Sequence, residues 1–150
     1  MSTRPINGWL KSGAAMFFLW GVLHVYAGGL MSIPFFTSGA GSNLAVVGFG
    51  LAEPLSSFER VASHITLNFG LDLAGYGILA VWLSINLFRG QHMKLSFALL
   101  VVMLGISDGA FVYSLLLPGY SPLAEGLPGP ILFLLGIPLV TKGLFFCGTQ

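Results

Sequence analysis

Asp72 and Asp108 are the residues of this chain whose type and position most clearly suggest chemistry. Residues 61–88 contain no charged residue besides Asp72, and residues 95–124 none besides Asp108. A carboxyl group at the centre of a bilayer costs about 2.5–3.5 kcal/mol on insertion scales, and it normally faces a protein interior or an aqueous cavity. His24 adds an imidazole within another uncharged stretch. Such groups bind protons, metal ions or polar ligands, so they predict a site within the membrane.

A row of polar residues accompanies Asp72. Arg60, His64, Asn68, Asp72 and Tyr76 follow one another at steps of four residues. Each step turns an α-helix by about 400°, so the row drifts slowly round one broad face. We expect it to lead from the outer surface toward the middle of the membrane. Two interpretations remain open: a water-filled entry path that begins at Arg60 and His64, or a hydrogen-bonded seam between helices.

His24, Asp72 and Asp108 are expected to lie at similar depths. His24 lies about 18 Å above the inner end of its helix, Asp108 about 21 Å above the inner end of its own, and Asp72 about 12 Å below the outer surface. In a hydrocarbon layer about 30 Å thick, all three fall in the central-to-outer half. The predicted ligand-binding site therefore combines His24, Asn68, Asp72, Tyr76 and Asp108.

The same residues admit plainer interpretations. His24 can be a neutral imidazole bonded to a neighbouring helix, and the two aspartates can serve helix assembly alone. A metal site of His24 with Asp72 and Asp108 has acceptable ligand types. No H-x-x-x-H or E-x-x-H spacing supports such a site. We therefore predict no metal centre, and the sequence indicates no particular cofactor.

The composition sets the elements that must position these residues. The chain has 150 residues, of which 55% are hydrophobic and only 7% charged. Soluble domains carry about 25% charged residues, so this chain cannot cover itself with a water-facing surface. A spanning helix needs roughly 20 apolar residues. We predict one all-α domain over 1–150, an integral membrane four-helix bundle with helices near 12–33, 62–88, 94–117 and 130–147.

A long outer connection is expected between the first two helices. The first helix is predicted to end near Pro34, and a Gly/Ser-rich tract follows. The apolar run Leu44–Ala52 is too short to cross the membrane, so it should lie in the interface or fold back over the bundle. Ser56 and Glu59 fit the S-x-x-E capping box, which indicates that the second helix begins near Ser57.

The basic residues indicate the topology. Four crossings place five basic residues on one side of the membrane: Arg4, Lys11, Arg89, Lys94 and Lys142. The positive-inside rule makes this side cytoplasmic. Both termini are then cytoplasmic, and the short loops suit a bacterial inner membrane. His92 is expected to be a surface residue of the cytoplasmic turn.

The single Cys147 excludes an internal disulfide, and no basic run predicts nucleic-acid binding.

The leading hypothesis is a non-catalytic membrane protein with a polar pocket inside the bilayer. It would bind a small or lipophilic ligand, or act as an accessory subunit beside a membrane-protein partner or a second copy. The convergence of ionisable groups without a catalytic motif favours this hypothesis. The alternatives are an intramembrane metal-dependent enzyme and a subunit of a proton-coupled transporter.

Overall fold

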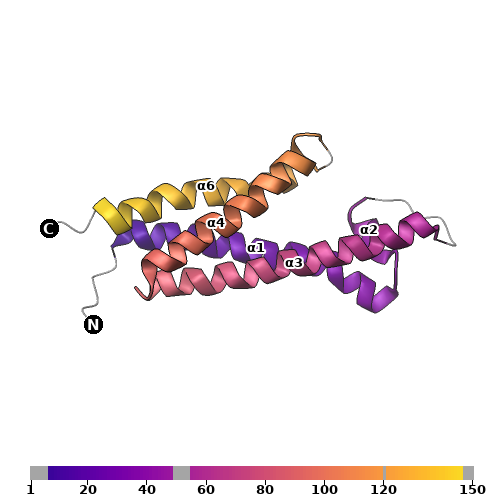
Figure 1. Cartoon of the computed structure of the whole chain (residues 1–150), viewed down its shortest axis with the longest axis horizontal. Coiled ribbons are helices and arrows are strands. Elements are labelled where there is room, and N and C mark those ends of the chain that lie inside the picture. Colours follow the sequence, from indigo (N-terminus) through magenta and orange to yellow (C-terminus); the bar gives the residue numbers. More distant parts are fainter. Residues whose placement is uncertain (1–6, 49–54, 120, 147–150) are drawn as a thin grey trace. The chain divides into compact units, whose positions relative to one another are not determined.

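The structure is a computed structural model that describes residues 7–48, 55–119 and 121–146. These residues form helices and turns without any strand (Figure 1). In chain order, the helices are α1 (Gly8–Ser38), α2 (Ser42–Val46), α3 (Ser57–Phe88), α4 (Met93–Phe111), the π-helical η1 (Val112–Leu116), α5 (Leu123–Gly126), α6 (Pro128–Thr141) and the π-helical η2 (Lys142–Phe146).

Four helical segments are long and apolar enough to cross a membrane: Gly8–Ser38, Ser57–Phe88, Met93–Leu116 and Leu123–Phe146. The predicted all-α class is confirmed, and the chain is a multi-pass membrane protein. Large apolar side chains such as Ile106 and Leu134 are more than 60% exposed, as expected for a surface that faces lipid. The described residues separate into two compact units.

The first unit, which we call the bundle unit, comprises residues 1–22 and 78–150. Its core takes residues from α1, α3, α4 and α6, so four helices surround one apolar interior. The buried core residues are Leu10, Ala14, Phe17, Trp20, Ala80, Leu83, Leu87, Leu100, Leu104, Phe133 and Val140. Small residues permit the close packing: a Cβ on Gly136 would lie 2.8 Å from the Phe17 ring.

One end of the bundle unit gathers basic residues. The Lys142 ammonium lies 3.7 Å from the centre of the Trp9 ring, and the Lys94 ammonium lies 5.9 Å from that of Phe145. The start of α1, the α3–α4 turn and η2 lie at this end (Figure 1). Its charges therefore sit beside aromatic rings, as they commonly do at a membrane surface.

The second unit, which we call the hairpin unit, comprises residues 23–77. It holds the second half of α1, α2 and the first half of α3. The two long helices approach very closely where Gly28 faces Gly70. A Cβ on Gly28 would collide with the Gly70 carbonyl oxygen and would lie 2.6 Å from the Ala74 nitrogen. Only residues without a bulky side chain allow such a crossing in a membrane.

The prediction that the first helix ends near Pro34 is wrong, because α1 continues to Ser38. Proline removes only one backbone donor, and hydroxyl groups in membrane helices often satisfy nearby carbonyls. The Thr37 hydroxyl donates to the Ile33 carbonyl at 3.1 Å, and the Ser42 hydroxyl donates to the Pro34 carbonyl at 2.6 Å.

The connection after α1 folds back on α3 through a buried polar cluster. The Asn43 amide donates to the Ser63 carbonyl at 2.8 Å, and the Ser63 hydroxyl donates to the Asn43 side-chain oxygen at 2.6 Å. The Gly41 N–H donates to the same hydroxyl at 2.9 Å. The apolar run predicted over Leu44–Ala52 thus starts in a docked helix, while its residues 49–52 lie outside the described residues.

The start of α3 confirms the predicted capping box. The Ser56 N–H donates to the Glu59 carboxylate at 2.7 Å, and the Glu59 N–H donates to the Ser56 hydroxyl at 3.2 Å. These reciprocal bonds satisfy donors that the first turn of a helix leaves open. The helix accordingly begins at Ser57, where the sequence placed it.

Candidate functional site

The lengths of the spans decide which polar residues must lie inside the bilayer. The hydrocarbon layer needs about 20 helical residues, whereas α3 has 32. A stretch of about 20 residues within α3 begins between 57 and 69 and ends between 76 and 88. Every such stretch contains residues 69–76. Asp72 and Tyr76 are therefore embedded whichever part of α3 crosses the membrane.

The same reasoning places three more residues. Any stretch of about 20 residues within Gly8–Ser38 contains residues 19–27, and hence Trp20 and His24. Any such stretch within Met93–Leu116 contains residues 97–112, and hence Asp108. His24, Asp72, Tyr76 and Asp108 thus all belong to the membrane-embedded parts of their helices.

Asp108 is buried in the bundle unit and bonded to Trp20. Its side chain is 5% exposed, and the Trp20 side chain is fully buried. The Trp20 indole N–H lies 2.9 Å from one carboxyl oxygen and 3.2 Å from the other. A buried indole needs an acceptor for its single N–H, and α4 supplies one here. The pair fixes how α1 faces α4.

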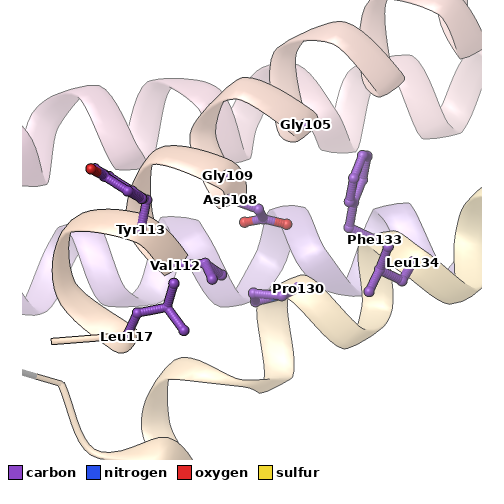
Figure 2. A pocket seen from close by; sticks show the side chains of 9 residues that line it. All are labelled: Gly105, Asp108, Gly109, Val112, Tyr113, Leu117, Pro130, Phe133 and Leu134. Carbon is purple, nitrogen blue, oxygen red and sulfur yellow. The ribbon is translucent and has the colours of Figure 1, made fainter. Parts of the chain in front are cut away.

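A cavity of about 270 Å³ lies beside Asp108, between α4 with η1 and the start of α6. Figure 2 shows the carboxyl group in the space between α4 and residues Pro130 and Phe133 of α6. The remaining wall is apolar apart from Tyr113. The complete lining is Gly105, Asp108, Gly109, Val112, Tyr113, Leu117, Pro130, Phe133 and Leu134. The cavity is close to the lower end of the range of small-molecule sites, about 300–1,000 Å³.

Two features of the backbone shape this cavity. The π-helical η1 follows α4 directly, and the Leu117 N–H bonds the Val112 carbonyl five residues back, at 2.9 Å. Short π-helical segments often occur at functional sites because they redirect the side chains of one turn. Gly109 also lines the space, and a Cβ added there would meet nothing within 4 Å. The missing side chain at Gly109 leaves part of the cavity open.

The predicted polar row lies on the outside of α3. Arg60, His64, Asn68, Asp72 and Tyr76 are all exposed. The Asn68 amide donates to the Asp72 carboxylate at 3.4 Å, a long bond within the row itself. The His64 ring packs against the Phe35 ring, with centroids 5.0 Å apart. Within the hairpin unit the row therefore forms no buried seam, and the choice between an entry path and a seam stays a prediction.

The predicted site residues fall into both units. His24, which is half-buried, belongs with Asn68, Asp72 and Tyr76 to the hairpin unit, whereas Asp108 belongs to the bundle unit. Asn68 and Asp72 come together directly through their hydrogen bond. The meeting of His24 and Asp72 with Asp108 stays a prediction.

Trp20 was not predicted from the sequence as the partner of Asp108. A signal was present, because a tryptophan inside a span must find an acceptor for its N–H. Trp20 lies about 18 Å along α1 from Gly8, and Asp108 lies about 22 Å along α4 from Met93. Both helices start at the same end of the bundle unit, so the two residues lie at comparable heights. The buried bonding between Asn43 and Ser63 was missed as well.

The described part of the chain contains no group of three or more His, Cys, Asp or Glu side chains that could hold a metal ion. The chain matches no family model, no curated protein and no solved structure. The features that bear on function are therefore the membrane-embedded polar residues and the cavity beside Asp108.

Proposed function

We propose that this membrane protein binds a small lipophilic molecule in the cavity between α4 and α6. The observation that carries the proposal is the carboxyl group of Asp108, which lies at the wall of an otherwise mainly apolar space inside a span. The Trp20 N–H holds that carboxyl in place. Ligand sites of small molecules combine an apolar lining with a few fixed polar groups in this way.

The lining defines the class of ligand. Rim residues Tyr113, Leu117 and Leu134 are 64–79% exposed, so the cavity is reached from the lipid side. A carboxyl group accepts several hydrogen bonds and also attracts a cation. The favoured ligand is a compact hydrophobic molecule that carries an amine or a hydroxyl donor and enters from the bilayer. Asp108 binds its polar group, and Val112 and Phe133 contact its apolar body.

Photolabelling with a lipophilic amine that carries a diazirine tests this proposal. The protein is reconstituted in nanodiscs, labelled, digested and mapped by mass spectrometry. We expect the label on the segments that line the cavity, residues 105–117 and 130–134. The substitution Gly109→Leu fills the cavity and should lower labelling about tenfold, which corresponds to ~1.4 kcal/mol of binding free energy.

Ala110→Leu is the matched control. Ala110 is exposed, follows Gly109 on the same helix and does not line the cavity. This variant should be labelled like the parent protein. Asp108→Asn should weaken labelling by the amine probe more than labelling by the corresponding alkane probe. Equal labelling of the Gly109→Leu and Ala110→Leu proteins would refute the proposal.

A second candidate function is that of an accessory subunit in a membrane complex. The observation that favours it is the exposed Asp72 side chain in a segment that every placement of α3 puts inside the bilayer. A carboxyl group that faces acyl chains is costly, so a partner helix with polar side chains should cover it. Tyr76 and Asn68 extend the same surface. The partner is another membrane protein or a second copy of this chain.

Co-purification tests this second function. A tagged chain is extracted in a mild detergent, and associated membrane proteins and oligomers are separated by native electrophoresis. The double variant Asn68→Leu/Asp72→Leu should keep its abundance and lose the larger species. The control Ile65→Val changes an exposed apolar residue of the same helix, and this variant should still form the larger species. A parent protein that migrates only as a monomer without partners would contradict this function.

The orientation that we propose has both termini in the cytoplasm. The Lys94 ammonium lies over a ring of η2 and the Lys142 ammonium over a ring at the start of α1. Lys11 in the first turn of α1 and Arg89 in the α3–α4 turn belong to the same end of the bundle unit (Figure 1). Clustered basic residues favour the cytoplasmic face. We also propose a bacterial inner membrane as the location, which the short turns between spans support.

A further inference from the structure

A second cavity lies at the basic end of the bundle unit, between the last turns of α3 and the first turns of α4. Its volume is about 410 Å³. The lining comes entirely from residues 82–99, which belong to one unit. The cavity is separate from the one beside Asp108, and its chemistry is different.

Polar groups gather at one end of this cavity. Arg89 and His92 lie in the turn, with the amides of Asn86 and Gln91 beside them. The sequence contains no acidic residue between Asp72 and Asp108. No carboxylate from the end of α3, the α3–α4 turn or the start of α4 therefore neutralises Arg89. A guanidinium with neighbouring amide and imidazole donors is well suited to bind a phosphate group.

The backbone holds the turn in a strained form. Gly90 has φ +69°, and the Gln91 N–H bonds the Asn86 carbonyl at 2.8 Å, which closes α3 in a Schellman motif. His92 has φ +44° and is the one non-glycine residue with positive φ among the described residues. A side chain in this region costs about 1 kcal/mol or more. The turn thus carries an imidazole beside Arg89 at a backbone cost that glycine would not have.

The other end of the cavity is apolar and continuous with the lipid-facing surface. Trp82, Leu95 and Leu99 line it and are 57%, 61% and 45% exposed. A ligand that fills the cavity must therefore offer an anionic end to Arg89 and a hydrocarbon end to Leu95 and Leu99. The lipid of the surrounding bilayer leaflet combines these two features.

We propose that this cavity binds an anionic phospholipid. Arg89 and His92 hold the phosphate group, Asn86 and Gln91 donate to its ester and headgroup oxygens, and the first carbons of an acyl chain lie along Trp82 and Leu99. Basic pockets between spans at the membrane surface recognise anionic headgroups in this manner. A specific lipid of the adjacent leaflet then anchors the end of α3 and the start of α4 at the membrane surface.

Quenching of Trp82 fluorescence by brominated lipids tests the proposal. The full chain with Trp9→Phe retains Trp20, which is fully buried, and Trp82. It is reconstituted into vesicles of phosphatidylcholine with a small fraction of either brominated phosphatidylglycerol or brominated phosphatidylcholine. We expect phosphatidylglycerol to occupy the site at least fivefold more tightly than phosphatidylcholine, judged from the fraction that gives half-maximal quenching.

Substitutions at the cavity and the addition of inorganic phosphate test which group the cavity recognises. Arg89→Gln should abolish the preference for the anionic lipid, and His92→Gly should reduce it without loss of folded protein. Arg60→Gln removes an exposed arginine of the hairpin unit and should leave the preference unchanged. Quenching that is equal for the two lipids in the parent chain, or unchanged by Arg89→Gln, would overturn the proposal. Loss of the preference in millimolar inorganic phosphate would assign the site to free phosphate instead.

Discussion

The indole of Trp20 and the carboxyl of Asp108 depend on each other because neither can reach water. Both lie in parts of their helices that every membrane placement keeps in the hydrocarbon layer, and their atoms are 2.9 Å apart at the closest. An unsatisfied donor or acceptor in this setting costs several times what it would cost at a wet surface. The pair therefore holds the Asp108 side chain in place at the wall of the cavity.

A double-mutant cycle measures this dependence. Asp108→Leu should destabilise the protein by about 1–3 kcal/mol, because it leaves the Trp20 N–H without this acceptor. Adding Trp20→Phe should cost less than the same change in the parent, with a coupling of about 0.6–1.7 kcal/mol, the range of strong hydrogen bonds between membrane helices. The free energy of unfolding in mixed micelles is the measurement. Trp82→Phe in place of Trp20→Phe should show additive effects.

Sequence alone located Asp108 but not its partner, for a physical reason. The cost of a carboxyl in hydrocarbon identifies the residue from its position in the chain, whereas its hydrogen bond depends on how each helix rotates about its own axis. That rotation follows from packing such as Phe17 against Gly136, which no periodicity encodes. For the same reason, the sequence does not show which residues of other helices lie beside Asp72. The bond from Asn68 to Asp72 lies within one helix, so the four-residue spacing was enough to predict that they are neighbours.

At the scale of the element, the contact between α1 and α3 in the hairpin unit depends on Gly28 and Gly70, which face each other without side chains. Gly28 faces the Gly70 carbonyl and the Ala74 nitrogen, which are backbone atoms and cannot move aside. Its neighbour Gly29 is different, because a Cβ there would lie 3.7 Å from the end of the Ile33 side chain, an ordinary contact. Two adjacent glycines thus have opposite requirements.

Alanine at these two positions should therefore have opposite effects. Gly28→Ala should separate the helices and lower the free energy of unfolding by about 1–3 kcal/mol, the range for overpacking. Gly29→Ala should be neutral or stabilising by up to ~1 kcal/mol, because alanine favours the helix over glycine. Chemical unfolding in micelles provides both values. Equal destabilisation by the two substitutions would show that the helices do not cross at Gly28.

The docking of α2 on α3 depends on the hydrogen bonds of the Asn43 side chain. Asn43→Ala should cost about 1–3 kcal/mol, because the buried Ser63 hydroxyl and carbonyl each lose a partner at once. Ser57→Ala, an exposed change at the start of α3, serves as the control and should be nearly neutral. Hydrogen exchange at the amides of residues 42–46 should rise in the first variant alone.

Elements were the level that the sequence predicted best. Apolar stretches interrupted by charges gave the four spans, and Ser56 with Glu59 gave the start of α3. The end of α1 was mispredicted at Pro34. The Ser42 hydroxyl that bonds the Pro34 carbonyl comes from beyond the turn that follows α1, and the sequence does not show the geometry of that turn. The docked helix α2 depends equally on contacts with a residue some twenty positions away.

For the whole molecule, the arrangement of basic residues makes the orientation testable. In a Cys147→Ser background, single cysteines are placed at Gln91 in the α3–α4 turn and at Ala124 in α5, both exposed. A membrane-impermeant thiol reagent applied to intact cells should label Ala124→Cys at once. Gln91→Cys should be labelled only after the cells are permeabilised. The reverse pattern would place the basic end outside.

The proposed function depends on a ligand in the cavity beside Asp108, and a density map of the protein in nanodiscs made from its own membrane would show whether one is bound. We expect density for a compact molecule between α4 and α6, with one polar atom within hydrogen-bond distance of the Asp108 carboxyl. The same map of the Gly109→Leu protein should lack it. A cavity closed by the packing of Phe133 and Val112, with Asp108 bonded only within the protein, would contradict the proposed function.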